Sequence, residues 1–187
     1  HVPLVAPKKY FDAYPLAEII LPPKIPGDQN DIPQNPANRR TTDNYKMDLN
    51  QQKGTLRAYY ASVSFVDALV GKILGALETT GQRDNTIVIF TSDHGYHLGE
   101  HDLWQKVSIH EESARVPLII CVPGKKTAVC HSLSELIDLY PTVSQLCGLK
   151  IPGNVQGKDI SIMFDDPTVK VRDCLLYTSD AADERQS

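Results

Sequence analysis

The chain lacks the features that mark several common protein classes. It has no excess of basic residues, since its formal net charge is −4 and its pI is near 5.8, and nucleic-acid binding requires a positive field. Its uninterrupted apolar runs are short, as in Thr86–Thr91, whereas a membrane-spanning helix needs about 20 mostly apolar residues. The sequence therefore predicts no nucleic-acid partner and no membrane span.

Cysteine pairs and a signal peptide are also missing. The four cysteines show no Cys-x-x-Cys pair and no other metal-binding spacing, so we expect small buried thiols rather than a disulfide framework. The sequence begins with His1 instead of methionine and has no signal-peptide pattern of a charged start and an apolar middle. We expect that the true amino terminus has been lost.

What is present fits one domain of moderate size. The chain has 187 residues, of which 41% are hydrophobic, and this is enough for one domain with a core. Residues 174–187 resemble the translation of a sequencing-library adapter, and the alternative is a genuine short acidic tail. We expect residues 1–173 to be part of one domain and residues 174–187 to be a non-native tail.

The pattern of the chain changes near residue 55. Eight of the thirteen prolines lie in the first 36 residues, which predicts an extended, loop-like segment over residues 1–54. From Thr55 onward, apolar residues recur at alternating steps of four and three, which predicts a helix that Gly81 ends as a cap. The apolar stripe consists of Tyr59, Val63, Val66, Val70, Ile73 and Leu77.

Two strands and a second helix follow. Thr86–Thr91 is a β-branched run without polar alternation, typical of a strand that is covered on both faces, and Val116–Val122 repeats this type. Asp138–Gly148 indicates a helix with Pro141 in its first turn and a glycine at its end. The order helix, strand, loop, strand, helix predicts an α/β core over residues 55–165.

The first strand leads into the densest group of chemically active residues. Asp93 and His94 follow the strand directly, and Gly95 allows the backbone to turn so that both side chains face the rim of a sheet, where α/β folds bind ligands. A carboxylate and an imidazole suit calcium, magnesium, manganese or zinc. The alternative is an aspartate that caps the turn beside a packed histidine, and spacing alone does not separate the two.

Two more histidines extend this group. On a helix, His97 and His101 would share a face with His94 and form a three-histidine zinc site. Gly95 and Gly99 disfavour a helix here, so we do not expect this site.

Several charged residues near this group have ordinary explanations. Lys106 is a lone lysine, which is usually a solvated surface charge unless an anion occupies a nearby pocket. Glu111, Glu112 and Arg115 fit a short helical turn with exposed charges. By its own context His1 carries no signal.

Four further motifs are Tyr59–Asp67, Thr91–His101, the run from Arg115 to Ile120, and Asp138–Thr142. Together they resemble the formylglycine-dependent sulfatase family, with the iduronate-2-sulfatase branch nearest. The resemblance covers residues 1 to about 165, and it includes the opening His1-Val-Pro and the later Tyr10–Pro15. It implies that residues 1–173 are part of a catalytic domain of the alkaline phosphatase-like α/β type, whose largely parallel central sheet is flanked by helices.

The resemblance also implies roles for residues at matched positions. Asp93 and His94 would be calcium ligands, with Mg²⁺ or another divalent metal as the less favoured ion. Lys106 would contact the sulfate group, and His1 would lie near the ester oxygen as a catalytic residue. The remaining residues of the motif, with roles in support or at the rim of the substrate pocket, are His97, Glu100 and His101.

The nucleophile of such enzymes is not found in this chain. The family makes a formylglycine from cysteine in a Cys-x-Pro-x-Arg motif with the help of a formylglycine-generating enzyme, and an early pair of aspartates completes the metal shell. Cys121 and Pro123 have the right offset, but Lys125 replaces the required arginine and the cysteine lies in an expected strand. We therefore reject Cys121 and expect this chain alone to be inactive.

The implied activity is hydrolysis of a sulfate ester on a sulfated sugar, as in glycosaminoglycan degradation, or on a small ester such as choline sulfate. The resemblance further implies an exported, periplasmic, extracellular or lysosomal protein. Two alternatives stay open: a phosphatase or phosphonate monoester hydrolase of the same superfamily, and a non-catalytic sulfatase-like binding domain.

Overall fold

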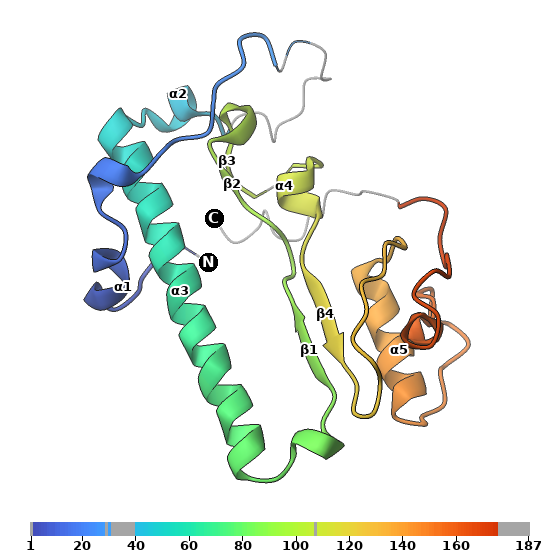
Figure 1. Cartoon of the computed structure of the whole chain (residues 1–187). Helices are drawn as coiled ribbons and strands as arrows, with labels where there is room; N and C mark the ends of the chain where they lie inside the picture. The colour runs from blue at the N-terminus through green and yellow to red at the C-terminus, as the bar shows by residue number, and fades with distance from the viewer. Residues whose placement is uncertain (1, 29, 31–39, 107, 176–187) are drawn as a thin grey trace. The chain divides into compact units, whose positions relative to one another are not determined.

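The computed structural model describes residues 2–28, 30, 40–106 and 108–175 (Figure 1). His1 and most of the expected tail, residues 174–187, lie outside these residues. The described chain forms two compact units. The first unit takes its described residues from His1–Arg83 and His94–Pro117, and the second from Asp84–Asp93 and Leu118–Thr178. The borders of these units differ from the expected change of pattern at residue 54. The assignment of residues 1–173 to one catalytic domain stays a prediction.

The first unit is built on one long helix, α3 (Leu49–Thr79), which has 31 residues. It begins before the expected Thr55, because a capping box between Asp48 and Gln51 starts it over polar residues that carry no apolar stripe. The expected cap at Gly81 is confirmed, with φ +65°. The other elements of this unit are α1 (Lys8–Asp12), η1 (Leu16–Glu18), α2 (Thr42–Tyr45), β2 (His97–Leu98), η4 (Glu100–Asp102), β3 (Trp104–Gln105) and α4 (Glu111–Ala114).

The proline-rich segment packs against α3. The guanidinium of Arg57 donates to the carbonyl oxygen of Phe11 at 3.0 Å, and the rings of Tyr10 and Phe65 lie 5.3 Å apart. Over residues 2–28 the regular elements are the short helix α1 and the 3-10 turn η1. Residues 31–39 of the predicted extended segment lie outside the described residues, whereas residues 40–54 contain α2 and the first residues of α3.

A small apolar core lies beside the first half of α3. Its buried members are Ile19, Leu56, Leu98 and Trp104, and a buried apolar side chain of this size contributes about 1.5–3 kcal/mol. Side chains packed around these four complete the core on its outer side. They are Tyr14, Leu21, Met47, Tyr59 and Tyr96.

The second half of α3 exposes much of its apolar stripe. Ile73, for example, is 64% exposed. By length and composition alone α3 could cross a membrane, although a core helix of a soluble protein passes the same test. By length and composition, the expectation that no segment approaches the requirements of a membrane-spanning helix is therefore wrong for α3. It rested on uninterrupted apolar runs, whereas α3 carries a few scattered charges such as Asp67 and Lys72 among many apolar residues.

The second unit contains the two expected strands, β1 (Val88–Thr91) and β4 (Leu118–Cys121). They pair antiparallel, so the expected largely parallel sheet is not what the described strands form. Phe90 and Ile119 are exposed, and the strands are not covered on both faces. The antiparallel pairing was not predictable from composition, because β-branched residues favour a strand without specifying the direction of the neighbouring strand. The mixture of helices and sheet agrees with the expected α/β class.

The expected second helix is α5 (Leu139–Leu146), with Pro141 in its first turn and Gly148 after its end at φ +68°. All four cysteines are free and lie in this unit, so the prediction of unpaired thiols is confirmed. Their expected burial is wrong for Cys121, Cys147 and Cys174, which are exposed. The remaining turns are η3 (Arg83–Asn85), which reaches the border of the units, η5 (Leu136–Asp138) and η6 (Ser161–Phe164).

One buried carboxylate organises the second unit. Asp138 is 0% exposed and accepts hydrogen bonds from the backbone N–H groups of Glu135 and Lys158 at 2.9 and 2.7 Å. Arg172 donates to the same carboxylate through Nε at 3.0 Å and also through Nη2. Burial by itself raises the pKa of Asp138, but the bonds from Arg172 and the two N–H groups hold the pKa below its usual value.

We expect Arg172→Leu to lower the free energy of unfolding by about 3 kcal/mol, because it leaves the charge of Asp138 buried without its partner. Since the folded pKa of Asp138 is lowered, its stabilisation is present above the pKa of an unfolded aspartate and is lost as the pH falls through the folded pKa. The difference between wild type and variant should therefore shrink in acid. Urea unfolding followed by circular dichroism at several pH values measures both effects.

The matched control is Lys125→Ala, which removes the exposed ion pair between Lys125 and Asp165. It should cost less than about 1 kcal/mol, because solvent screens such pairs. Equal losses from the two variants would contradict the assigned role of Asp138.

Candidate functional site

The expected metal ligands follow β1 directly. Asp93 is exposed and is the last residue of the range Asp84–Asp93 in the second unit. His94 is half-buried and is the first residue of the range His94–Pro117 in the first unit. Nδ1 of His94 lies 2.7 Å from the carbonyl oxygen of Gly95. Because a carbonyl only accepts, Nδ1 of His94 is the donor in this contact.

Gly95 is fixed by a close approach of two backbone segments. Its N–H donates to the carbonyl oxygen of Ser113 at 2.8 Å, and a Cβ at this position would lie 2.0 Å from the carbonyl oxygen of Glu112. Gly95 is not among the glycines with positive φ. The glycine is therefore required by its contact with α4 rather than by the freedom of the turn that the sequence suggested.

The loop between β2 and Lys106 has a strained backbone. His101, Asp102 and Gln105 have φ values of 56°, 58° and 68°, in the left-handed region that non-glycine residues rarely adopt. Each such residue costs on the order of 1 kcal/mol and persists only when its surroundings hold it. The Gln105 side chain is held by Arg40, which donates to it at 2.6 Å.

A buried tryptophan anchors the same loop. The indole N–H of Trp104 donates to the hydroxyl of Thr42 at 2.8 Å, and that hydroxyl donates to a carboxylate oxygen of Asp102 at 2.7 Å. Lys106 follows this anchor and is half-buried. The backbone that carries Lys106 is thus specified by packing and hydrogen bonds within the first unit.

His97 lies inside the protein. It is 1% exposed in β2, and its Nε2 lies 2.7 Å from the hydroxyl oxygen of Ser108. Burial lowers the pKa of His97, which favours the neutral ring. Within the described residues its Nδ1 has no hydrogen-bond partner. With so little exposed surface, this ring is placed to support the loop.

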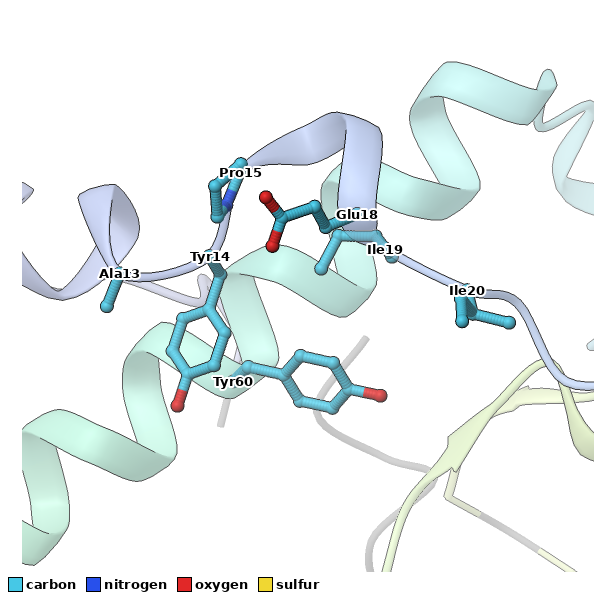
Figure 2. A pocket seen from close by; sticks show the side chains of 7 residues that line it. All are labelled: Ala13, Tyr14, Pro15, Glu18, Ile19, Ile20 and Tyr60. Atoms are coloured by element: carbon cyan, nitrogen blue, oxygen red, sulfur yellow. The ribbon is translucent and has the colours of Figure 1, made fainter.

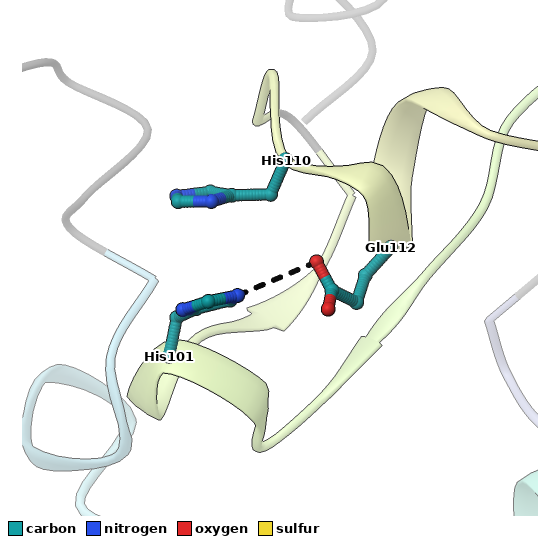
Figure 3. Close-up of side chains that lie close together, drawn as sticks. All are labelled: His101, His110 and Glu112. Atoms are coloured by element: carbon teal, nitrogen blue, oxygen red, sulfur yellow. Dashed lines mark ion pairs between the residues drawn. The ribbon is translucent and has the colours of Figure 1, made fainter. Parts of the chain in front are cut away.

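The structure gathers histidines in a way that the sequence did not suggest. His101 stacks on His110, with ring centroids 4.4 Å apart, and Glu112 lies beside both (Figure 3). His97 lies in β2 and His101 in η4. Sequence reasoning treated Glu112 as an ordinary charge and passed over His110. No local spacing rule marks them, because their meeting depends on how α4 packs.

An open hollow lies elsewhere in the first unit (Figure 2). None of the expected site residues lines it, and Glu18 is the one charged residue of its lining. Tyr14, which belongs to the lining, instead forms a 2.6 Å hydrogen bond with Ser64 of α3. Its groups offer no arrangement suited to ester hydrolysis. The residues that line it are Ala13, Tyr14, Pro15, Glu18, Ile19, Ile20 and Tyr60.

Comparisons with known proteins agree with the motifs. A family model described as sulfatase matches residues 22–149, a range that includes Asp93, His94 and Lys106. The chain is 36% identical over 175 residues to a sulfatase of Formosa agariphila, covering 88% of this chain and 34% of the relative. It is 31% identical over 191 residues to human iduronate 2-sulfatase, covering 81% of this chain and 35% of the relative.

A solved structure gives the same picture for the fold. The phosphonate monoester hydrolase of Silicibacter pomeroyi is similar with a TM-score of 0.77 at 29% identity, over 88% of this chain and 35% of the other. The chain spans about a third of the length of the relatives it matches.

We expect Gly95→Ala to lower the free energy of unfolding by about 2–4 kcal/mol, because the added methyl group meets the backbone of Glu112. Amide hydrogen exchange in peptides that span residues 94–114 should also quicken, since the bond from residue 95 to Ser113 is displaced. Urea unfolding and exchange mass spectrometry measure the two effects.

Gly71→Ala is the matched control, because a Cβ at Gly71 meets nothing within 4 Å on α3. It should be neutral or should stabilise by up to about 1 kcal/mol, as alanine is the better helix former. If Gly95→Ala behaved like this control, the close approach would not constrain the loop.

Proposed function

Because the chain belongs to the sulfatase family, we propose that it is part of a sulfuric ester hydrolase in which Asp93, His94 and Lys106 serve the reaction. The observation that carries the proposal is the family match over residues 22–149, which includes all three positions. The geometry of the first unit supports it, because hydrogen bonds hold Gly95 directly after His94 and Trp104 two residues before Lys106.

We propose that Asp93 and His94 hold a calcium ion. The exposed carboxylate of Asp93 supplies the oxygen that calcium prefers, and His94 supplies an imidazole beside it in sequence. The donor types also suit other divalent ions, of which magnesium is the less favoured candidate. When bound, the ion would offset negative charge on the sulfate oxygens. An early pair of aspartates, implied by the family pattern, would complete its shell, and that pair is not in this chain.

The roles of the other residues follow from charge and proton transfer. The ammonium of Lys106 would bind a non-bridging oxygen of the sulfate and stabilise the charge that grows during attack at sulfur. His1, which lies outside the described residues, would give a proton to the departing alcohol oxygen. His97 would support the pocket from within. The nucleophile, a formylglycine produced by a formylglycine-generating enzyme, would come from a part of the protein not in this chain.

We propose a sulfated sugar as the substrate, as in iduronate-2-sulfatase-like enzymes of glycosaminoglycan degradation. The similarity to human iduronate 2-sulfatase supports this choice. One alternative is a phosphonate monoester hydrolase, which the similarity to the Silicibacter pomeroyi structure favours. The other is a non-catalytic binding domain, against which the intact Asp93, His94 and Lys106 speak.

In the full-length enzyme, Asp93→Asn should lower calcium affinity and the turnover of an aryl sulfate together, because it removes one ligand charge from the ion. Calorimetric calcium titration and a colorimetric assay measure the two quantities. Asp67→Asn is the control, since Asp67 is an exposed aspartate of α3 and should change neither. Retained calcium affinity in Asp93→Asn would return Asp93 to a turn-capping role.

Lys106→Ala in the same enzyme should lower kcat/KM for an aryl sulfate by at least roughly 100-fold, as expected for loss of a group that stabilises transition-state charge. Parallel assays with an aryl sulfate and a phosphonate monoester identify the preferred ester. A preference for the phosphonate would select the alternative function. The chain of 187 residues by itself should hydrolyse neither ester.

A further inference from the structure

Three side chains of the first unit converge without a role in the proposed reaction. His101 comes from η4, while His110 and Glu112 lie at the start of α4 (Figure 3). Each offers one donor atom, and these three atoms all lie within 4.8 Å of one another. The two rings are stacked with their centroids 4.4 Å apart and an interplanar angle of 17°, so their nitrogen lone pairs lie in nearly parallel planes and one ring must rotate before both can bind the same ion.

A carboxylate behind His101 orients its ring. Nδ1 of His101 lies 2.7 Å from a carboxylate oxygen of Asp28. An ionised carboxylate only accepts, so Nδ1 donates and Nε2 faces Glu112, 3.5 Å from its Oε2. A histidine that donates one ring nitrogen to a carboxylate and turns the other toward a ligand cluster is the usual arrangement in metal sites.

The carboxylate of Glu112 needs a positive partner. Its Oε2 is buried and has no hydrogen-bond donor of good geometry within the described residues. The closest approach is that of His101 at 3.5 Å, and Asp28 adds a second negative charge on the far side of the ring. The Glu112 side chain as a whole is 31% exposed, so the atom that a nearby cation or proton would compensate is the buried Oε2.

We propose that His101, His110 and Glu112 bind a divalent metal ion of the zinc type, at a site that shares no ligand with Asp93 and His94. Two imidazole nitrogens and one carboxylate oxygen suit zinc better than calcium, which prefers oxygen ligands throughout. Three protein ligands leave a fourth position for water or another ligand.

The geometry requires a small contraction around the ion. With metal–ligand bonds of about 2.0 Å, tetrahedral donor atoms lie roughly 3.3 Å apart, closer than the 4.8 Å limit that the three atoms now satisfy. Rotation of the half-buried His110 and Glu112 side chains at the start of α4 provides this movement. The bound ion would tie η4 to α4, and thereby reinforce the contact of α4 with Gly95.

The test is a titration of the full chain with Co²⁺, which stands in for zinc and absorbs visible light in a tetrahedral site. The protein is prepared without a histidine tag, and bound metal is removed with EDTA. We expect one equivalent of Co²⁺ to give the absorption band and one equivalent of Zn²⁺ to abolish it. His110→Asn and Glu112→Gln should each weaken Co²⁺ binding by at least roughly 10-fold, and Asp28→Asn should weaken it about 10-fold through the orientation of His101.

Two further variants control for other binding. His131→Asn removes an exposed histidine outside the cluster and should leave the affinity unchanged. Asp93→Asn should also leave it unchanged, which separates this site from the proposed calcium site. His110→Asn alters a half-buried side chain and is checked for folding by circular dichroism, so the test holds even if Glu112→Gln fails to fold.

Three outcomes would overturn the proposal. The first is Co²⁺ affinity that His110→Asn and Glu112→Gln leave unchanged. The second is loss of the cobalt band in Asp93→Asn, which would assign the metal to the other ligands. The third is no stoichiometric binding at neutral pH, which would mean that a proton on His101 compensates Glu112 and Asp28.

Discussion

The close approach of Gly95 to the backbone of Glu112 and Ser113 is the constraint on which the rest of the site depends. It fastens the segment after β1 to the start of α4, with a hydrogen bond of 2.8 Å and no room for a side chain. The same contact fixes His94 on one side and brings Glu112 toward His101 on the other. The absence of a side chain at Gly95 therefore affects both proposed metal sites, one with His94 and one with Glu112, because backbone segments in such close contact cannot shift independently.

Local patterns predicted the two longest helices and the two strands of the second unit. The stripe of apolar residues indicated α3, and glycines after α3 and α5 marked their ends because both adopt positive φ. The β-branched runs indicated β1 and β4. The direction of their pairing was not predictable in this way, since it depends on the path of the chain between them. Exposure of the α3 stripe was also missed, because periodicity shows which residues share a face but not whether anything covers it.

The site could be predicted only where its residues are neighbours in sequence. Asp93, His94 and Lys106 lie in one short stretch, and the resemblance to sulfatases supplied roles that spacing left open. His110 entered no motif, because its meeting with His101 depends on a loop held in left-handed conformations by Trp104 and its hydrogen bonds. The cluster of His101, His110 and Glu112 therefore results from tertiary packing, which the propensities of single residues do not predict.

The distribution of cysteines separates the two units chemically. All four thiols belong to the second unit, and Cys121, Cys147 and Cys174 are exposed without partners. A thiol-reactive fluorophore or spin label therefore attaches to the second unit alone, at the end of β4, after α5 or near residue 174. Signals from such labels would report on unfolding of the second unit. Fluorescence of Trp104, the single tryptophan of the chain, would report on unfolding of the first unit, so both can be monitored separately in one sample.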